Sequence, residues 1–459
     1  MSRRHLKQRH GAIMQRSATL CGSNLLRINA LLVLTLVAFT ARAGSPRIER
    51  WTTANGVPVY YVHAPEIPMF DLRVVFAAGS ARDGAQPGIA SLTSAMLAED
   101  TADLAVDDFH AALEATGASL GAGSLRDMAW LSLRSLTDPK AATPAVELMR
   151  AALLSPRFSD EVFVRTRKQM LAGIKSEEGS PGALGAKALY RAIYGEHPYA
   201  APTSGTETTV GAFTVADAKS FYQRYYVAKN AVLIVVGALD RAMAEKMTNA
   251  LVSNLPGGEA PPPLPAVKPL ATPHAVQIEF PAEQSHLMLG QPGIARQDPD
   301  YFPLVVGNHV LGGNGTVSLL FGEIREQRGL SYSVSSYFEP MAVAGPFVAT
   351  LQTDRPRQEE ARKVLHAVIK KFIDDGPPSA ALAAAKRNLI GGFPLRIDNN
   401  SKITEYITLI AFYALPLDYL TTYPQHVAAV TAAQIKDAFK RRVHLETMAE
   451  ITVGTSATP

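Results

Sequence analysis

Two stretches of the chain share one plan. Thr214–Gly237 is TVADAKSFYQRYYVAKNAVLIVVG, and Thr431–Gly454, which begins 217 residues later, is TAAQIKDAFKRRVHLETMAEITVG. Each opens with a threonine suited to cap an amphipathic helix, continues through a basic helix end and a short break, and closes with a β-branched strand and a glycine. Identical residues at this offset include Lys219/Lys436, Arg224/Arg441, Val236/Val453 and Gly237/Gly454. The pattern indicates one structural unit used twice.

A second pair of segments supports the duplication. A strand-like segment leads into Thr137-Asp138-Pro139 and a helix, and another leads into Thr353-Asp354-Arg355-Pro356 and a helix, at an offset of 216 to 217 residues. A helix followed by a strand recurs by chance in many proteins, but two segments that agree on one offset favour duplication. Between the copies, a Pro-, Gly- and Ala-rich stretch is typical of a linker. We therefore expect domains over residues 46–255 and 275–455, with the linker at 256–274.

Strands and helices are mixed within each copy. Asp71–Ala78 and Met128–Leu136 alternate with period two, as half-buried strands do, whereas Ala142–Leu154 and Glu359–Ile373 show helical spacing. No regular strand–helix–strand rhythm is present. We expect an α+β fold of two homologous tandem domains, each a mixed or antiparallel sheet covered by helices.

The positive charge of the chain is confined to its start. The 459 residues include 45 Lys and Arg against 41 Asp and Glu, but residues 1–43 hold seven of the basic side chains and no acid. The remaining 38 basic and 41 acidic groups give a net charge of −3. A nearly neutral body argues against nucleic acid as a partner.

Residues 1–43 have the features of a secretory signal peptide. The apolar run Ile28–Thr40 follows basic residues and leads into Ala41-Arg42-Ala43, the small-x-small pattern of a cleavage site. A retained anchor is the alternative, but the apolar run is too short to span a hydrocarbon layer of ~30 Å comfortably. Met14 is an alternative start, and Cys21, the only cysteine, leaves with the leader. We expect export to the periplasm and no stable membrane span after cleavage.

The rest of the chain lacks the familiar catalytic spacings. Its nine histidines include no pair four residues apart, so neither orientation of the two-histidine zinc helix can be built. No nucleophile elbow, Ser-x-x-Lys or Walker loop is present. Each isolated histidine is therefore interpreted as a structural or surface residue.

One glycine-rich segment stands out. Gly312-Gly313-Asn314-Gly315 precedes Val317–Gln327, in which Val317, Leu320, Phe321 and Ile324 form an apolar stripe typical of a helix. A phosphate cradle is an alternative, but its lysine and full motif are missing, so we expect a loop that passes extended backbone.

Two polar side chains follow this segment. Arg325 lies in the last expected helical turn, Gly329 suits a left-handed cap, and Tyr332 starts the expected strand Leu330–Tyr337. At one corner, Arg325 and Tyr332 could both donate hydrogen bonds to a carbonyl oxygen or oxyanion. The alternative is an arginine that complements the helix dipole and a tyrosine in the core.

Together these segments resemble the insulinase/pitrilysin family of zinc peptidases, which includes the mitochondrial processing peptidase. The glycine-rich segment, the helix and Arg325-x-x-Arg328-Gly329-Leu330-x-Tyr332 resemble the C-terminal half of that family. His197-Pro198-Tyr199, Gly205 and the helix and strand of Thr214–Gly237 resemble its N-terminal half. The resemblance implies a processing-peptidase-like fold that forms one half of a clamshell, which we expect to open about residues 255–274.

The family's zinc motif is degenerate here. Active members carry His-x-x-Glu-His on a helix after a Gly-x-Ala lead, and a further glutamate some 75–80 positions later. In this chain the lead is Gly88-Ile89-Ala90, and the metal and base positions fall on Ser91, Ser94, Ala95 and Gly173. Zinc needs at least three good ligands, so we expect no metal and no cofactor in this chain.

The resemblance also implies a role and a partner. In the heterodimeric bacterial branch, an inactive subunit contributes the Arg and Tyr, and a catalytic subunit with His-x-x-Glu-His holds the zinc. Arg325 and Tyr332 would then bind and polarise the scissile carbonyl, while residues 312–315 guide unfolded peptide. The alternatives are a pseudo-peptidase that acts as a scaffold and a homodimeric peptide-binding chaperone.

Overall fold

The computed structural model describes residues 46–454, and Pro46–Pro459 forms one compact unit by its internal contacts. The predicted signal peptide over residues 1–43 lies outside the described residues and stays a prediction. Among the residues that are described, no helix is both long enough and apolar enough to cross a membrane.

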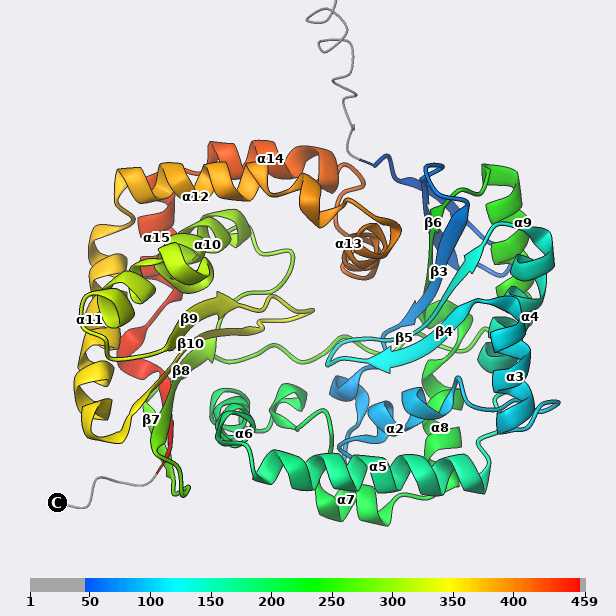
Figure 1. Ribbon diagram of the computed structural model, residues 1–459, viewed down its shortest axis with the longest axis horizontal. Coiled ribbons are helices and arrows are strands. Elements are labelled where there is room, and N and C mark those ends of the chain that lie inside the picture. The colour runs from blue at the N-terminus through cyan, green and yellow to red at the C-terminus, as the bar shows by residue number, and fades with distance from the viewer. Residues whose placement is uncertain (1–45, 455–459) are drawn as a thin grey trace, which may run out of the picture. The chain divides into compact units, whose positions relative to one another are not determined.

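The first half is a six-stranded sheet with helices around it (Figure 1). Its strand order is β1-β2-β6-β3-β5-β4, in which β2 and β6 run parallel and the other neighbours antiparallel. The strands are β1 (Glu49–Thr52), β2 (Pro58–His63), β3 (Met69–Phe76), β4 (Ser119–Ser124), β5 (Ala129–Leu136) and β6 (Ala231–Gly237). The helices are α2 (Ile89–Met96), α3 (Val106–Thr116), α4 (Pro139–Leu154), α5 (Asp160–Glu178), α6 (Pro181–Tyr194), α7 (Glu207–Ala212), α8 (Val215–Tyr225) and α9 (Arg241–Val252).

The second half repeats this plan with five strands in the order β7-β11-β8-β10-β9. Here β7 and β11 form the parallel pair. The strands are β7 (His274–Ile278), β8 (Gln284–Pro292), β9 (Ser333–Phe338), β10 (Pro346–Asp354) and β11 (Ala449–Val453). The helices are α10 (Tyr301–Asn308), α11 (Gln358–Asp375), α12 (Ser379–Gly391), α13 (Asn400–Phe412), α14 (Tyr419–Ala429) and α15 (Ala432–Arg442).

The duplication and the α+β prediction are confirmed. Without β1, the first sheet has the same connectivity as the second, with the parallel pair in the same place. The repeated segments form α8 with β6 and α15 with β11. In both, the threonine hydroxyl oxygen of a capping box accepts a hydrogen bond from a backbone N–H, Asp217 N to Thr214 and Gln434 N to Thr431.

One helix from each half packs on the sheet of the other half. Helix α6 of the first half packs on β8 and β11, and α13 of the second half packs on β6 and β3. The contact of α6 is close because Gly185 faces the Met288 side chain and Gly290 faces Leu189 and Ile193. The two halves therefore share their cores.

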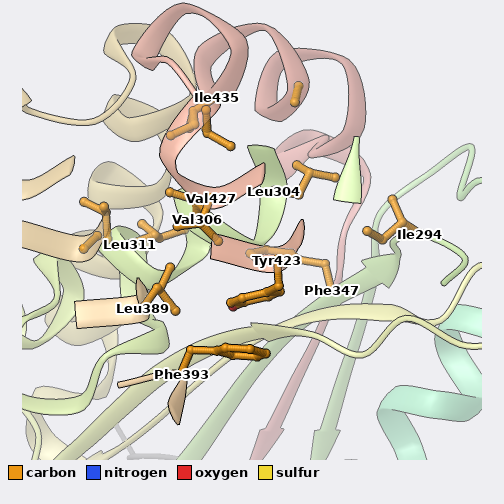
Figure 2. Close-up of a cluster of buried hydrophobic side chains, with 14 of the residues drawn as sticks. Ile294, Leu304, Val306, Leu311, Phe347, Leu389, Phe393, Tyr423, Val427 and Ile435 are labelled. Atoms are coloured by element: carbon orange, nitrogen blue, oxygen red, sulfur yellow. The ribbon is translucent and has the colours of Figure 1, made fainter. Parts of the chain in front are cut away.

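Buried apolar side chains in the second half fix α10 against the sheet and its neighbours (Figure 2). Leu304 and Val306 on α10 are fully buried in one cluster with Phe347 of β10. In the same cluster the rings of Phe393 and Tyr423 stack with centroids 4.5 Å apart. This packing sets the position of the segment that follows α10.

A buried carboxylate joins the two halves. Asp127, between β4 and β5, accepts hydrogen bonds from the Tyr199 hydroxyl, from the Tyr413 hydroxyl at 2.9 Å and from Ala342 N at 2.7 Å. Burial raises the pKa of both tyrosines, so both phenols stay protonated and donate. The contact ties the first half to Ala342 and Tyr413 of the second.

The Pro-rich segment is fixed to the first half. Residues 256–273 contain neither helix nor strand. Their carbonyls accept hydrogen bonds from Arg82 Nη1, to Pro262 O at 2.8 Å, and from His197 Nε2, to Pro265 O at 3.0 Å. The Pro-rich segment therefore crosses from the first sheet to the second as irregular backbone, and hydrogen bonds from Arg82 and His197 hold it against the first half.

Candidate functional site

The glycine-rich segment begins as a helix, not as the extended loop that the sequence suggested. Helix α10 continues without a break into a π-helical turn, His309–Gly313. A Cβ atom on Gly312 would lie 2.4 Å from Ser336 Oγ and 2.6 Å from Ser336 N. The prediction of extended backbone at Gly312 and Gly313 was wrong, because glycine is needed here for close packing of the helix end on β9.

Two buried polar side chains hold this helix end. Asn308 Nδ2 donates to Ser336 O at 2.9 Å, and Ser336 Oγ donates to Asn308 Oδ1 at 2.7 Å. Gly313 lies against the same asparagine. The segment leaves the helix only at Asn314, and Gly315 then starts a short 3-10 turn, Gly315–Val317. Of the four predicted peptide-guiding residues, Gly312 is buried, while Gly313 and Gly315 are exposed and Asn314 is half-buried.

The helix that carries Arg325 starts later than its apolar stripe predicts. Leu319 and Leu320 are helical, and Phe321–Glu326 is a second π-helical segment. Leu320, Phe321 and Ile324 are buried as predicted, but Val317 is 74% exposed. The reason is the 3-10 turn, after which the Ser318 hydroxyl oxygen accepts from Phe321 N and so caps the helix. π-Helical segments are rare and concentrate at functional sites.

Arg325 presents an unneutralised guanidinium at the end of this helix. Its Cζ lies 4.8 Å from the centre of the Phe321 ring, a cation–π contact that orients the exposed side chain. The acid of the preceding turn, Glu323, is paired with Arg328 at 2.6 Å. Among the residues that the structure describes, Arg325 has no ion-pair partner. Its donors are free for a ligand.

Tyr332 follows a well-braced turn. Gly329 has a φ of 58°, the left-handed conformation predicted for it. Arg357 donates to the carbonyls of Arg328 and Gly329, each at 2.8 Å, and Thr353 Oγ1 donates to Leu330 O. The strand starts at Ser333, one residue after Tyr332 and three later than predicted. The backbone that presents Tyr332 is therefore fixed by β10 and by Arg357.

The Tyr332 side chain is not a core residue. It is 71% exposed, and no hydrogen bond to its hydroxyl is present within residues 46–454. The alternative of a core tyrosine is wrong for this reason. An exposed arginine and an exposed tyrosine, held by one helix end and one braced turn, leave polar donors available to an acceptor outside the chain.

The four positions that correspond to the family's zinc site do not fit a metal. Ser91, Ser94 and Ala95 lie on α2, and Gly173 lies on α5, which packs against α2. Ser94 is buried at 1% exposure, and Ala95 and Gly173 carry no ligand atom. No group of three His, Cys, Asp or Glu side chains suited to a metal ion occurs in the described part of the chain. Ser94 is the buried member of the four, whereas Ala95 and Gly173 are exposed.

The start of α2 is capped from outside the helix. The Asp83 carboxylate accepts from Gly88 N at 2.7 Å and from Ala90 N at 3.0 Å. Burial raises the pKa of Asp83 to about 7, against the lowering effect of these two bonds. The start of α2, which carries the Gly88-Ile89-Ala90 lead, is thus fixed by a carboxylate from the preceding turn.

Sequence reasoning missed the residues that support the site. Four side chains position the glycine-rich segment and the turn before Tyr332, and no site motif includes them, although Thr353 lies in a repeated segment: Asn308, Ser336, Thr353 and Arg357. Their contacts join residues 23 to 29 positions apart, so spacing along the chain gives no signal for them.

Comparison with known proteins agrees with this geometry. Residues 59–207 match the family model described as insulinase (peptidase family M16), and residues 212–389 match the model described as peptidase M16 inactive domain. A crystal structure of a peptidase M16 inactive domain from Pseudomonas fluorescens is 37% identical, with a TM-score of 0.86 over 90% of this chain and all of that one.

Curated relatives include one named as a non-peptidase homologue and others named as zinc proteases. A protein named non-peptidase homolog YmxG from Helicobacter pylori is 25% identical over 417 residues, 90% of this chain and 96% of the relative. An uncharacterized zinc protease from Mycobacterium leprae is 29% identical over 78% of this chain and 81% of its own length. The chain belongs to peptidase family M16, with both family domains present.

Proposed function

We propose that this protein is the non-catalytic subunit of an exported heterodimeric M16 endopeptidase. It binds extended, unfolded peptide and polarises the scissile carbonyl, and the zinc belongs to a partner subunit that carries His-x-x-Glu-His. The observation that supports this most directly is the exposed pair Arg325 and Tyr332, of which Arg325 lacks an acidic partner among the described residues.

Amide hydrolysis moves charge onto the scissile peptide bond. The carbonyl oxygen gains negative charge as water attacks, and donors aimed at it stabilise the transition state more than the ground state. A guanidinium and a phenol are both donors, and the bracing of Tyr332 by β10 reduces the cost of orienting it. With Ser91, Ser94, Ala95 and Gly173 at the metal positions, the chain alone has no means to activate water.

The scaffold and homodimeric chaperone alternatives predict different outcomes. A scaffold has no use for two exposed donors beside the glycine-rich segment, and a chaperone needs no metal-bearing partner. A homologue with His-x-x-Glu-His and without the Arg/Tyr pair, encoded next to this chain, would be the expected partner.

The test is reconstitution with that partner and a quenched peptide substrate. Neither chain alone should cleave, and the mixture should. Arg325→Ala and Tyr332→Phe should each lower kcat/KM of the mixture by about 10²-fold, the usual cost of one oxyanion donor. Arg387→Ala on α12 and Tyr337→Phe on β9 are matched controls, because both side chains are exposed and lie outside the pair.

Three results would contradict the proposal. One is a loss within about twofold for both site variants, another is cleavage by this chain alone, and the third is tightly bound stoichiometric zinc in this chain after purification. If the mixture cleaves the peptide and neither variant changes its kcat/KM, the heterodimer is supported and only the carbonyl-binding role of Arg325 and Tyr332 is contradicted.

Export is proposed from the leader and needs its own measurement. We expect the protein in the periplasmic fraction with an N-terminus at Gly44, after Ala41-Arg42-Ala43. N-terminal sequencing of the protein from fractionated cells decides this. An N-terminus at Met1 or Met14 in the membrane fraction would show a retained anchor instead.

A further inference from the structure

A pocket of about 790 Å³ lies where the two halves and the Pro-rich segment meet. Its lining comes from the connection after β3, the start of β6, the connection after β8 and the end of α13, together with Pro263 and Leu264. A volume of this size is typical of small-molecule sites. The pocket is separate from Arg325, Tyr332 and the glycine-rich segment, none of which lines it.

The charged residues that line this pocket are mostly cationic. Arg82, Lys229 and Arg296 contribute three positive charges, and Asp127 contributes the single negative charge. Within residues 46–454, none of the three cations forms an ion pair with a carboxylate. Asp127 already accepts from two tyrosine hydroxyls and one backbone N–H, so its lone pairs are largely used.

The two arginines are held in place by uncharged groups. Arg82 Nη1 donates to Pro262 O at 2.8 Å, and Arg296 Nη1 donates to the Tyr301 hydroxyl at 3.4 Å. Their Nε atoms are buried and have no acceptor among the described residues. Partial burial of a cation without a counter-charge costs free energy, which an anion in the pocket would offset.

The neutral polar residues of the pocket are otherwise engaged. Gln297 Nε2 donates to Tyr413 O at 2.6 Å, and Asn230 Nδ2 donates to Tyr225 O at 2.7 Å. Met341, Leu264 and Ala411 supply apolar surface. The remaining guanidinium donors and the Lys229 ammonium are therefore the groups available to a ligand, and the lining has a net charge of +2.

Arg82 and Arg296 occupy corresponding connections of the two halves. In the first half Ala81 N donates to Arg126 O at 2.8 Å, and in the second Arg296 N donates to Met341 O at 2.8 Å. When β1 is left out, each connection follows the second strand of its sheet in chain order, β3 in the first half and β8 in the second. One arginine from each half therefore lies beside the same pocket, although by these hydrogen bonds the counterpart of Arg296 is Ala81, one residue before Arg82.

We propose that this pocket binds a doubly charged oxyanion, in the simplest case a phosphate group, between Arg82, Arg296 and Lys229. Planar guanidinium groups suit phosphate and carboxylate oxygens, which they can bind in a bidentate manner, and the lysine adds a point charge. A bound anion would join groups from both halves, so it would stabilise their contact. The proposal does not depend on the peptidase role.

Calorimetric titration of the purified protein with inorganic phosphate, in chloride buffer of constant ionic strength, tests this site. We expect saturable binding of one anion per chain and a rise in Tm with phosphate concentration. Arg82→Gln and Arg296→Gln should each weaken binding by about tenfold or more, because each removes a charge-assisted bond. Lys229 is exposed, so Lys229→Gln should keep the fold and still weaken binding.

The controls separate this site from general electrostatics. Lys168→Gln on α5 and Arg387→Gln on α12 remove exposed cations away from the pocket and should leave binding unchanged. A parallel titration with succinate distinguishes a phosphate site from a dicarboxylate site, and binding of either that is lost in the pocket variants supports the proposal. No saturable binding of either anion, or equal binding by the wild type and Lys229→Gln, would overturn it.

Discussion

The two exchanged helices contact the opposite sheets through different chemistry. Helix α6 approaches β8 of the second half through glycine, with Gly290 opposite Leu189 and Ile193. Helix α13 approaches β3 of the first half through polar groups, since Arg73 donates to Thr408 Oγ1 at 3.2 Å and to Glu405 at 2.7 Å. One topology is therefore built twice, but its contacts are not symmetric.

The same divergence appears at the functional positions. In the first half α2 ends at Met96, and its metal positions hold Ser91, Ser94 and Ala95. In the second half α10 continues into a π-helical turn and leads to exposed donors at Arg325 and Tyr332. Duplication conserved the backbone hydrogen bonding of each sheet, whereas side chains in equivalent places took on different tasks.

The largest effect is expected at the π-helical turn that only the second half has among the described elements. Gly312→Ala should lower the free energy of unfolding by about 3 kcal/mol, because the new methyl group meets Ser336 N as well as its side chain. Denaturant unfolding measures this. Gly315→Ala is the control and should cost about 1 kcal/mol, because no atom lies within 4 Å of a Cβ there and only the strain of its positive φ of 32° is added. Equal losses would show that the turn is not packed on β9.

The contact of α6 gives the next largest effect. Gly290→Val should cost about 2 kcal/mol, because a Cβ would lie 2.9 Å from Ile193 Cδ1 in a buried contact. The matched variant is Gly121→Val in β4. No atom lies within 4 Å of a Cβ built there, so no loss of stability is expected. Thermal unfolding of both variants tests whether α6 belongs to the core of the second half. Equal thermal stability of the two variants would argue against the packing of α6 on β8.

The hydrogen bonds that connect the residues before α2 and before α10 to a later helix also differ between the halves, and they should respond differently to acid. Gln86 bonds Asp217 before α2, whereas Asp300 before α10 accepts from Arg441 and Arg442, each at 2.7 Å. The hydrogen bond from Arg441 is the main cause that lowers the Asp300 pKa to about 2. A lowered folded-state pKa means that the stabilisation is present above the unfolded value of about 4 and is lost as pH falls towards 2.

Asp300→Asn isolates this contribution. We expect the variant to be about 1 kcal/mol less stable than the wild type at pH 6, less than the full pKa shift implies because Asp300 is partly solvated and screened. The difference should vanish near pH 2. Urea unfolding at both pH values measures it, and a difference that does not change with pH would contradict the assignment.

The smallest effect is expected at the polar contact of α13. Glu405 is 62% exposed, so Glu405→Gln should change stability by only about 0.5 kcal/mol. Arg73 keeps its bond to Thr408 and its position 5.6 Å from the Trp130 ring centre. Thermal unfolding of Glu405→Gln and of Gly290→Val compares the polar contact of α13 with the apolar contact of α6. A larger loss for the polar one would reverse that comparison.

The sequence predicted most of the architecture but only part of the site. The repeated segments, their threonine caps and the alternating strands gave both sheets, because hydrophobic period and capping are local properties. Spacing also placed Arg325 and Tyr332 on either side of the left-handed Gly329. It failed at Gly312 and Val317, where the contacts with Ser336 and a 3-10 turn override the local pattern.

By itself, the sequence determined that the chain is a duplicated α+β protein with no two histidines four residues apart after its leader, because both facts follow from residue types at fixed spacings. Only the tertiary structure decided which polar groups are exposed, which helices cross to the other half, and that Arg82 and Arg296 line one pocket. These properties depend on contacts between residues far apart in the chain, whose geometry the packing of the two sheets sets and no local pattern records.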